Sequence, residues 1–212
     1  MYNYPHYKEA EREKILAFMK AHPFVMLIAT TATGRPEVTQ VPVLLEEREG
    51  RLFISGHIAK KSTHQQALAE NPQALVIFTG AHVYVSGTWY TTNLQQASTW
   101  NYVSIHARGA VHWMDEHGLI GLLRKLSLHF ENGNRASTTI YDNLPESYLG
   151  KLRQAIVGFE IEITELENVY KLSQNRDEKS YDNIVSELKK QEGDGRVIGE
   201  LMEERKSKVF PS

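Results

Sequence analysis

The residues best suited to chemistry lie in three short segments of the chain. The first is GHIAKKSTHQQ, residues 56–66, in which two lysines and two hydroxyl residues follow a predicted strand and precede a predicted helix. Backbone N–H groups and the dipole at a helix start favour an anion, and Lys60 or Lys61 can add positive charge. The segment therefore predicts a phosphate site. The alternative is that both lysines are solvated and that Ser62 only caps the helix.

The second segment is SGTWYTTNLQQASTWNYVSIHARG, residues 86–109, where two pairs of aromatic residues flank a polar loop. Trp89 or Trp100 could lie beside a planar ring, and Asn101 and Tyr102 could form hydrogen bonds with its heteroatoms. The same aromatic residues would also suit a dimer interface, so the segment by itself leaves both interpretations open.

The third segment is KLSQNR, residues 171–176, directly after the last predicted strand. Its uncharged residues Ser173, Gln174 and Asn175 offer hydrogen-bond donors and acceptors of the kind that a flavin edge requires. A loop that caps the following helix would have the same composition, and this alternative also stays open.

Several other kinds of site have no support in the sequence. The chain has no GxSxG elbow, Walker loop or GxGxxG element, which leaves hydrolase, NTPase and Rossmann functions without their motifs. It contains no cysteine, so a disulfide framework and a thiolate site are excluded. The nine histidines include no HExxH pair, and no metal site is predicted.

The elements that must position these segments are mostly short strands. Apolar periodicity and turn residues predict a helix over residues 7–22, strands over 24–31, 37–46, 51–55, 74–79, 82–86, 102–113 and 155–166, and a helix over 62–71. Residues 115–148 are expected to form a helix followed by a polar loop. Two amphipathic helices, joined at Gly193-Asp194-Gly195, are expected in the tail. Many short strands with few helices between them indicate an α+β, mainly β, barrel.

Charge and hydropathy limit the partners of the chain. The formal net charge is −2, and residues 177–208 of the tail carry nine acidic and seven basic side chains. Two helices joined by a glycine turn could read DNA, but a DNA reader normally has the opposite charge bias, so packing on the barrel or on a partner subunit is favoured. Neither a signal peptide nor a membrane span is recognisable, and a cytoplasmic protein is expected.

Five segments, taken in their order along the chain, resemble those of a known family. It is the PaiB-like family of FMN-binding negative transcriptional regulators, which lies within the pyridoxamine-phosphate-oxidase-like split-barrel group. The segments are MYNYPHY, GHIAK, LVIFTGAHVYVSGTWY, STWNYVSIHARG and KLSQNR, and together they extend over nearly the whole chain. The resemblance implies an FMN-binding split antiparallel β-barrel with peripheral helices, a homodimer, and FMN at the subunit interface. It places the barrel domain at residues 1–176, with a helical insertion at about 115–150, and a helical appendage at 177–212.

The resemblance also implies positions for the residues that contact the flavin. The strand along the ring and ribityl chain would contain Thr39, Gln40, Val41 and Pro42. The phosphate end would contain His57, Lys60, Lys61 and Ser62. The loop and strand near the ring would contribute Trp100, Asn101 and Tyr102, and the C-terminal segment would contribute Ser173, Gln174 and Asn175.

The chain departs from the family pattern at three positions. Gly87 and Ser98 stand where prolines are common, which puts the rigidity of the loop between them in question. Gln40 stands where a histidine is frequent, which puts histidine-dependent chemistry in question.

Three functions stay open on the sequence alone. The first is a flavin-dependent regulator acting through a DNA operator or a regulatory partner. The second is an FMN-dependent oxidoreductase that uses a nicotinamide donor, and the third is a split barrel that binds haem or another ligand.

Overall fold

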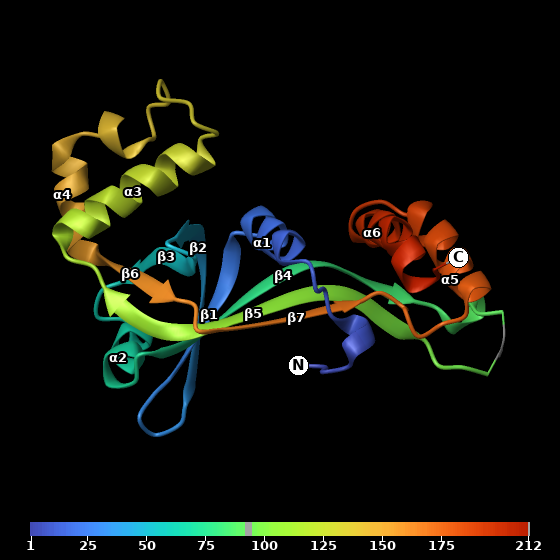
Figure 1. Cartoon of the computed structure of the whole chain (residues 1–212). Helices are drawn as coiled ribbons and strands as arrows, with labels where there is room; N and C mark the ends of the chain where they lie inside the picture. The colour runs from blue at the N-terminus through green and yellow to red at the C-terminus, as the bar shows by residue number, and fades with distance from the viewer. Residues whose placement is uncertain (92–94, 212) are drawn as a thin grey trace. The chain divides into compact units, whose positions relative to one another are not determined.

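The computed structural model describes residues 1–91 and 95–211 of the chain. The strands are β1 Phe24–Thr30, β2 Pro36–Arg48, β3 Arg51–Ala59, β4 Gln73–Val85, β5 Thr99–Trp113, β6 Ile156–Glu162 and β7 Glu165–Lys171 (Figure 1). The α-helices are α1 Arg12–Ala21, α2 Thr63–Glu70, α3 Glu116–Phe130, α4 Glu146–Ala155, α5 Glu178–Lys189 and α6 Asp194–Val209. Short 3-10 helices lie at Pro5–Tyr7, Gly87–Trp89 and Tyr141–Asn143. None of the described helices is long and apolar enough to cross a membrane.

The strands form one sheet in the order β4-β1-β2-β3-β6-β5-β7, and β4 also pairs with β5. The registers between β1 and β2, β2 and β3, β3 and β6, and β5 and β6 are all antiparallel. This is the α+β, mainly β, barrel that the sequence predicts.

The chain divides into two compact units, each described by itself below. The sheet unit contains Met19–Phe78 and His106–Glu167, and the tail unit contains Met1–Phe18, Thr79–Ile105 and Asn168–Ser212. Strands β4, β5 and β7 contribute residues to both units.

Two tight turns set the register of the first three strands in the sheet unit. Glu49 and Gly50, between β2 and β3, both have positive φ, of 51° and 74°, as a two-residue hairpin turn with the right twist requires. Gly34, between β1 and β2, has φ of 83°, and the N–H of Thr31 donates to the carbonyl of Arg35 at 2.9 Å across that turn.

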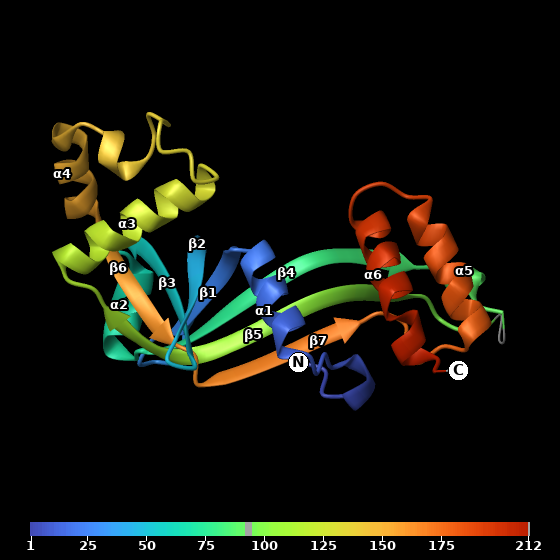
Figure 2. The same ribbon diagram turned by 45° about the horizontal axis from the view of Figure 1, so that its top comes forward.

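The core of the tail unit fixes its two C-terminal helices. Tyr181, Ile184 and Leu188 of α5 and Ile198 and Met202 of α6 are fully buried. They share one apolar cluster with residues at the ends of the strands, which include Val85, Val103, Tyr170 and Leu172. Figure 2 shows α5 and α6 side by side at the ends of β4, β5 and β7.

The helix predicted over residues 7–22 is shorter in the structure, where α1 starts only at Arg12. The backbone of Glu9 explains the late start. Its N–H donates to the side-chain oxygen of Asn168 at 2.8 Å, and its carbonyl accepts from the side-chain nitrogen of Asn168 at 3.1 Å. Neither the N–H nor the carbonyl of Glu9 is therefore available for a helical hydrogen bond at this position.

The remaining differences concern strand boundaries and one helix. The strands predicted over residues 74–79 and 82–86 are one strand, β4, while the single strand predicted over 155–166 is divided into β6 and β7. At the division, the N–H of Ile163 donates to Leu52 and the N–H of Thr164 donates to Arg108, both at 2.9 Å. Helix α4 has no counterpart in the predicted elements, although Pro145 directly before it is a helix-start signal.

Candidate functional site

The first group of predicted site residues lies in the sheet unit, where β2 changes its partner strand. Residues 36–42 of β2 pair with β1, whereas residues 43–48 pair with β3. Beyond Gly56, His57 and the two residues that follow it in β3 pair with β6. The predicted ring strand, Thr39, Gln40, Val41 and Pro42, therefore lies directly before the partner change, and His57 lies directly after it on β3.

Close packing explains the glycine at this point. A Cβ on Gly56 would lie 2.8 Å from Cζ of Phe159 and 3.1 Å from the carbonyl oxygen of Pro42. Pro42 has no N–H to donate to a neighbouring strand, which suits a position at which pairing changes. Gly56 and Pro42 together hold β2 and β3 close at the start of the split.

The side chains of the ring strand are not equally available. Val41 is buried in the core, while Gln40 is exposed and Thr39 and Pro42 are half-buried. The hydroxyl of Thr39 shares a 2.8 Å hydrogen bond with Nδ1 of His64, which is 3% exposed. Gln40 is therefore the member of these four residues that presents an exposed polar side chain, and Val41 contributes to packing.

The predicted phosphate end is a turn that leads from β3 into α2. Ser62 is the N-cap of α2, and its hydroxyl oxygen accepts from the N–H of Gln65 at 3.1 Å, as the sequence predicts. Lys61 has a positive φ of 61°, and its N–H donates to the side-chain oxygen of Gln65 at 2.6 Å. The ammonium of Lys60 donates to the carbonyl of Arg153 at 3.0 Å, whereas within residues 1–91 and 95–211 no partner is found for that of Lys61.

An acidic side chain also lies at this turn. A carboxylate oxygen of Glu37 accepts from the hydroxyl of Thr63 at 2.9 Å, and the other carboxylate oxygen lies 3.3 Å from Nε of Arg35. Arg35 therefore offsets the negative charge of Glu37, and two ammonium groups and a helix start remain as the features that fit a phosphate.

Burial disfavours the charged form of both histidines of this region. Burial lowers the pKa of His57, and burial also lowers the pKa of His64, against a smaller opposing effect of Glu37. His57 therefore adds no positive charge to the phosphate end at neutral pH. Nε2 of His64 is buried and has no hydrogen-bond partner among the described residues.

The second group of predicted residues lies in the tail unit, on β5 and after β7. Asn101 is fully buried, and its side-chain oxygen accepts from the hydroxyl of Ser173 at 3.0 Å. Ser173 has a positive φ of 61°. Gln174 caps the same turn, because its side-chain oxygen accepts from the N–H of Leu172 at 2.7 Å and its side-chain nitrogen donates to the carbonyl of Tyr170. Structural contacts therefore occupy much of the polar capacity that the sequence assigns to a flavin edge.

The aromatic residues of β5 remain accessible. Trp100 is 53% exposed and lies beside the exposed Tyr84, with 6.0 Å between the ring centroids. Tyr102 is half-buried, and burial raises the pKa of its hydroxyl, with a smaller contribution from Tyr2 and Tyr7. Trp100 and Tyr102 are thus accessible to a ligand or to another subunit, and their contact with either stays a prediction.

Gly87 and Ser98, two of the departures from the family pattern, are joined by a hydrogen bond. The N–H of Gly87 donates to the hydroxyl oxygen of Ser98 at 2.9 Å, a bond that a proline at position 87 could not make. A Cβ on Gly87 would also lie 2.4 Å from the carbonyl oxygen of Gln96. Glycine and serine therefore hold the two ends of this loop together where prolines are common in the family; residues 92–94 between them lie outside the described residues.

A small pocket in the tail unit shows which residues the sequence interpretation missed. Its volume is about 230 Å³, and Lys171, Arg176, Tyr2, Tyr4 and Tyr7 line it beside Ser173. The signal was present in the sequence, since KLSQNR begins and ends with a cation and MYNYPHY contains the three tyrosines. Among the described residues no group of His, Asp and Glu side chains is arranged to hold a metal ion.

Solved structures share this fold. The conserved hypothetical protein Rv2991 from Mycobacterium tuberculosis is 10% identical, with a TM-score of 0.56 over 81% of this chain and 91% of that protein. The FAD and heme binding protein from Mycobacterium smegmatis is 18% identical, with a TM-score of 0.53 over 77% of this chain and 72% of that protein. The fold and the partner change in β2 define a split β-barrel.

The family follows from the sequence comparison. Residues 1–165 match the model of the family described as "Putative FMN-binding domain", and the chain belongs to this family. It is also 29% identical to the "Protease synthase and sporulation protein PAI 2" of Bacillus subtilis (strain 168), over 98% of this chain and 99% of that protein. These matches confirm the resemblance to the PaiB-like FMN-binding family.

Proposed function

We propose that the chain is a homodimeric FMN-binding regulator whose flavin phosphate binds at the turn of residues 56–63 in the sheet unit. The observation that carries the proposal is the partner change in β2, because it opens the sheet beside a turn with two lysines. The family match at residues 1–165 includes this whole region.

Each part of the turn has a defined task in this proposal. Lys61, whose ammonium is free of described partners, supplies charge to the phosphate, and Lys60 supplies charge from the position that Arg153 fixes. Ser62 shapes the first turn of α2, so that the N–H groups of that turn face one place.

We assign the ring of the flavin to the place where β2 changes its partner strand, rather than to the pocket of the tail unit. Gln40 provides an exposed amide, and Pro42 provides an apolar surface at the partner change. Bound FMN would supply redox and ligand-sensing capacity, while the chain supplies binding, orientation and electrostatics. Trp100 and Tyr102 are proposed as further contacts in the assembled homodimer, since their rings are accessible.

A comparison of two flavins tests the phosphate assignment. FMN and riboflavin differ by the phosphate, so Lys60→Ala and Lys61→Ala, alone and together, should weaken FMN binding much more than riboflavin binding. Each lost charge-assisted contact should cost about 1.5–3 kcal/mol of FMN binding. Quenching of flavin fluorescence measures both affinities, and Lys151→Ala, an exposed lysine of the same unit, is the matched control.

Equal losses for both flavins would show that the lysines do not contact the phosphate. An absorption spectrum with added FMN also separates the other functions. NADH-dependent bleaching of the bound flavin would indicate an oxidoreductase, and a haem spectrum in place of a flavin spectrum would indicate a haem binder.

A further inference from the structure

A hydrogen bond between Thr39 of β2 and His64 of α2 joins the two parts of the proposed flavin site. The ring is assigned beside Gln40, the next residue of β2, and the phosphate is assigned to the start of α2. The hydroxyl of Thr39 lies 2.8 Å from Nδ1 of His64, in the first turn of that helix. Thr39 therefore adjoins both parts of the site.

A second bond holds the same two elements together. The hydroxyl of Thr63 donates to a carboxylate oxygen of Glu37 at 2.9 Å. Glu37 and Thr39 are two positions apart on β2, so their side chains lie on one face of the strand. Thr63 and His64 are the first two residues of α2. The start of the helix is thus fixed against this face of β2.

The ring nitrogens of His64 decide which atom donates in the bond with Thr39. A neutral imidazole carries one proton, on Nδ1 or on Nε2, and burial, which lowers the pKa of His64, disfavours a second one. Nε2 is buried and has no partner among the described residues, so a proton there would be a buried N–H without an acceptor. Buried N–H groups of the backbone are left unpaired more rarely than buried acceptors, and the same preference places the proton of His64 on Nδ1. Nδ1–H then donates to the hydroxyl oxygen of Thr39.

This assignment leaves the hydroxyl proton of Thr39 available. The oxygen accepts from His64, and within residues 1–91 and 95–211 the hydroxyl has no second hydrogen bond. The side chain of Thr39 is half-buried rather than enclosed. The part of FMN between its ring and its phosphate is the ribityl chain, so ribityl and phosphate oxygens are the acceptors that FMN offers next to this strand.

We propose that His64 is a positioning residue of the flavin site. By donating from Nδ1 to Thr39, it turns the hydroxyl proton of Thr39 toward an oxygen of the ribityl chain or of the phosphate. This role rests on the proposed flavin-binding function.

The proton on Nδ1 can be observed in the unaltered protein. Two-bond ¹H–¹⁵N correlation spectra of protein labelled with ¹⁵N-histidine distinguish the two tautomers, and a His64→Gln variant identifies the signals of His64. We expect a protonated Nδ1 and an unprotonated Nε2, both without flavin and with it. A proton on Nε2 in protein that binds flavin would overturn the role of His64 and leave the proposed function intact. Absence of flavin binding to the unaltered protein would overturn both.

Flavin affinities test whether the hydroxyl of Thr39 is a donor to the ligand. Thr39→Val removes the hydroxyl at nearly constant shape and should weaken FMN binding by roughly three- to tenfold, whereas Thr39→Ser should keep most of the affinity. Thr138→Val, at an exposed threonine of the same unit, is the matched control. Riboflavin identifies the acceptor, because a loss for both flavins indicates a ribityl oxygen and a loss for FMN alone indicates a phosphate oxygen.

A double-variant cycle separates positioning from packing. If His64 acts through Thr39, His64→Leu should weaken FMN binding in the unaltered sequence but change it little in the Thr39→Val background. The tautomer and the Thr39 variants decide the matter even where His64→Leu does not fold. Equal losses from His64→Leu in both backgrounds, unchanged affinity in Thr39→Val, or a Thr39→Ser variant as weak as Thr39→Val would each overturn the proposal.

Discussion

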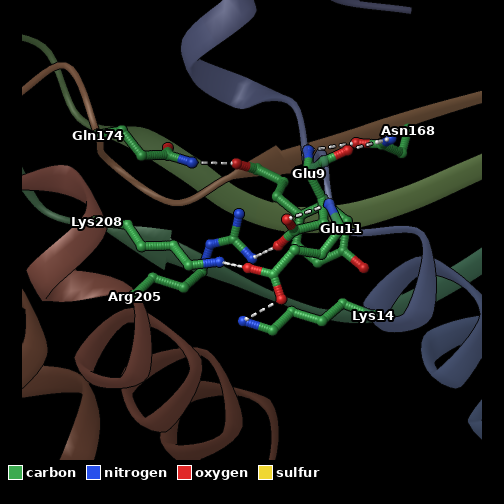
Figure 3. A network of polar contacts seen from close by, with 8 residues as sticks. Glu9, Glu11, Lys14, Asn168, Gln174, Arg205 and Lys208 are labelled. Carbon is green, nitrogen blue, oxygen red and sulfur yellow. Dashed lines mark hydrogen bonds and ion pairs between the residues drawn. The ribbon is translucent and has the colours of Figure 1, made fainter.

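Glu9 and Arg205 form a buried ion pair between residues that are 196 positions apart in the sequence. Their side chains are only 3% and 10% exposed, and the guanidinium of Arg205 also lies 4.7 Å from the ring centroid of Tyr170. The pair is the centre of the network that attaches the N-terminal segment to α6 (Figure 3).

Removing one partner of this pair should destabilise the protein strongly, because the other charge stays buried without compensation. We expect Glu9→Leu or Arg205→Met to lower the free energy of unfolding by about 3–5 kcal/mol, and the double variant to lose far less than the sum of the two. Urea denaturation measures all three. Lys208→Ala removes the exposed partner of Glu11 and should have a much smaller effect. Additive losses in the double variant would contradict the coupling.

Position 56, where β2 changes its partner strand, should not accommodate a side chain. An added Cβ would lie 2.8 Å from Phe159, so Gly56→Ala should cost about 1–3 kcal/mol of stability. Gly121 on α3 is the matched control, since nothing lies within 4 Å of its added Cβ. Because alanine is the better helix former, Gly121→Ala should stabilise the protein by about 1 kcal/mol. A neutral Gly56→Ala in denaturation experiments would mean that the strands are not held this closely.

Stability should fall when the pH is lowered through the range of histidine titration. Burial lowers the pKa of both His57 and His64 in the folded chain, so below about pH 6.5 the unfolded chain binds protons that the folded chain does not. The free energy of unfolding should therefore rise from pH 5 to pH 7, to an extent of order 1 kcal/mol per unit of pKa difference. His64→Gln should reduce this slope, whereas His117→Gln, at an exposed position on α3, should leave it unchanged. An unaltered slope in His64→Gln would refute the assignment.

Local signals predict much of this structure because they act over a few residues. Ser62 caps α2, the turns at Gly34 and Glu49-Gly50 join the first strands, and the tail forms two helices, all as the sequence indicates. What the sequence could not predict depends on contacts between distant residues. The side chain of Asn168 forms a hydrogen bond with the backbone of Glu9, so α1 starts later than predicted. The N–H groups of Ile163 and Thr164 donate to two different strands, so the predicted strand is divided there.

The candidate site shows the same division between local and distant effects. The capped turn with its two lysines is visible in the sequence, whereas the partner change of β2 that places it beside Gln40 is a property of the sheet. The polar run Ser173, Gln174 and Asn175 has the composition of a ligand site, but Ser173 and Gln174 mainly stabilise their own turn. Lys171 and Arg176, on either side of that run, line a small pocket of the tail unit.

The proposed homodimer predicts a solution mass of twice 24.2 kDa at micromolar concentration. Large exposed aromatic side chains such as Trp100 and Tyr84 usually mark an interface. If Trp100 is central to it, Trp100→Asp should weaken the dimer by about 2 kcal/mol or more. Tyr148→Asp, at a side chain with the same 53% exposure, is the comparison variant. Light scattering after size exclusion measures both, and a stable monomer that binds FMN would exclude a flavin site shared between subunits.

Direct repression would require the chain to bind DNA, and its charge argues against general affinity. Contacts to phosphates supply most non-specific DNA affinity and make it fall steeply with salt. The chain carries a formal net charge of −2, and the α5 and α6 region of residues 177–208 has nine acidic and seven basic side chains. Several of those basic side chains already have acidic partners, including Lys189 with Glu203, Arg196 with Glu200 and Lys206 with Asp182.

We therefore expect no measurable binding to random duplex DNA near physiological salt, with or without FMN. The buried faces of α5 and α6 support the same expectation, because Tyr181, Leu188 and Ile198 pack into the core of the tail unit and are not available to enter a groove. Fluorescence anisotropy with a labelled random duplex, at low and at physiological salt, measures this directly. Regulation would then act through a particular operator or a protein partner. Tight binding that weakens steeply between the two salt concentrations would instead make the exposed faces of α5 and α6 candidate DNA contacts, and Lys190→Ala with Lys179→Ala would then be the first variants to reduce it.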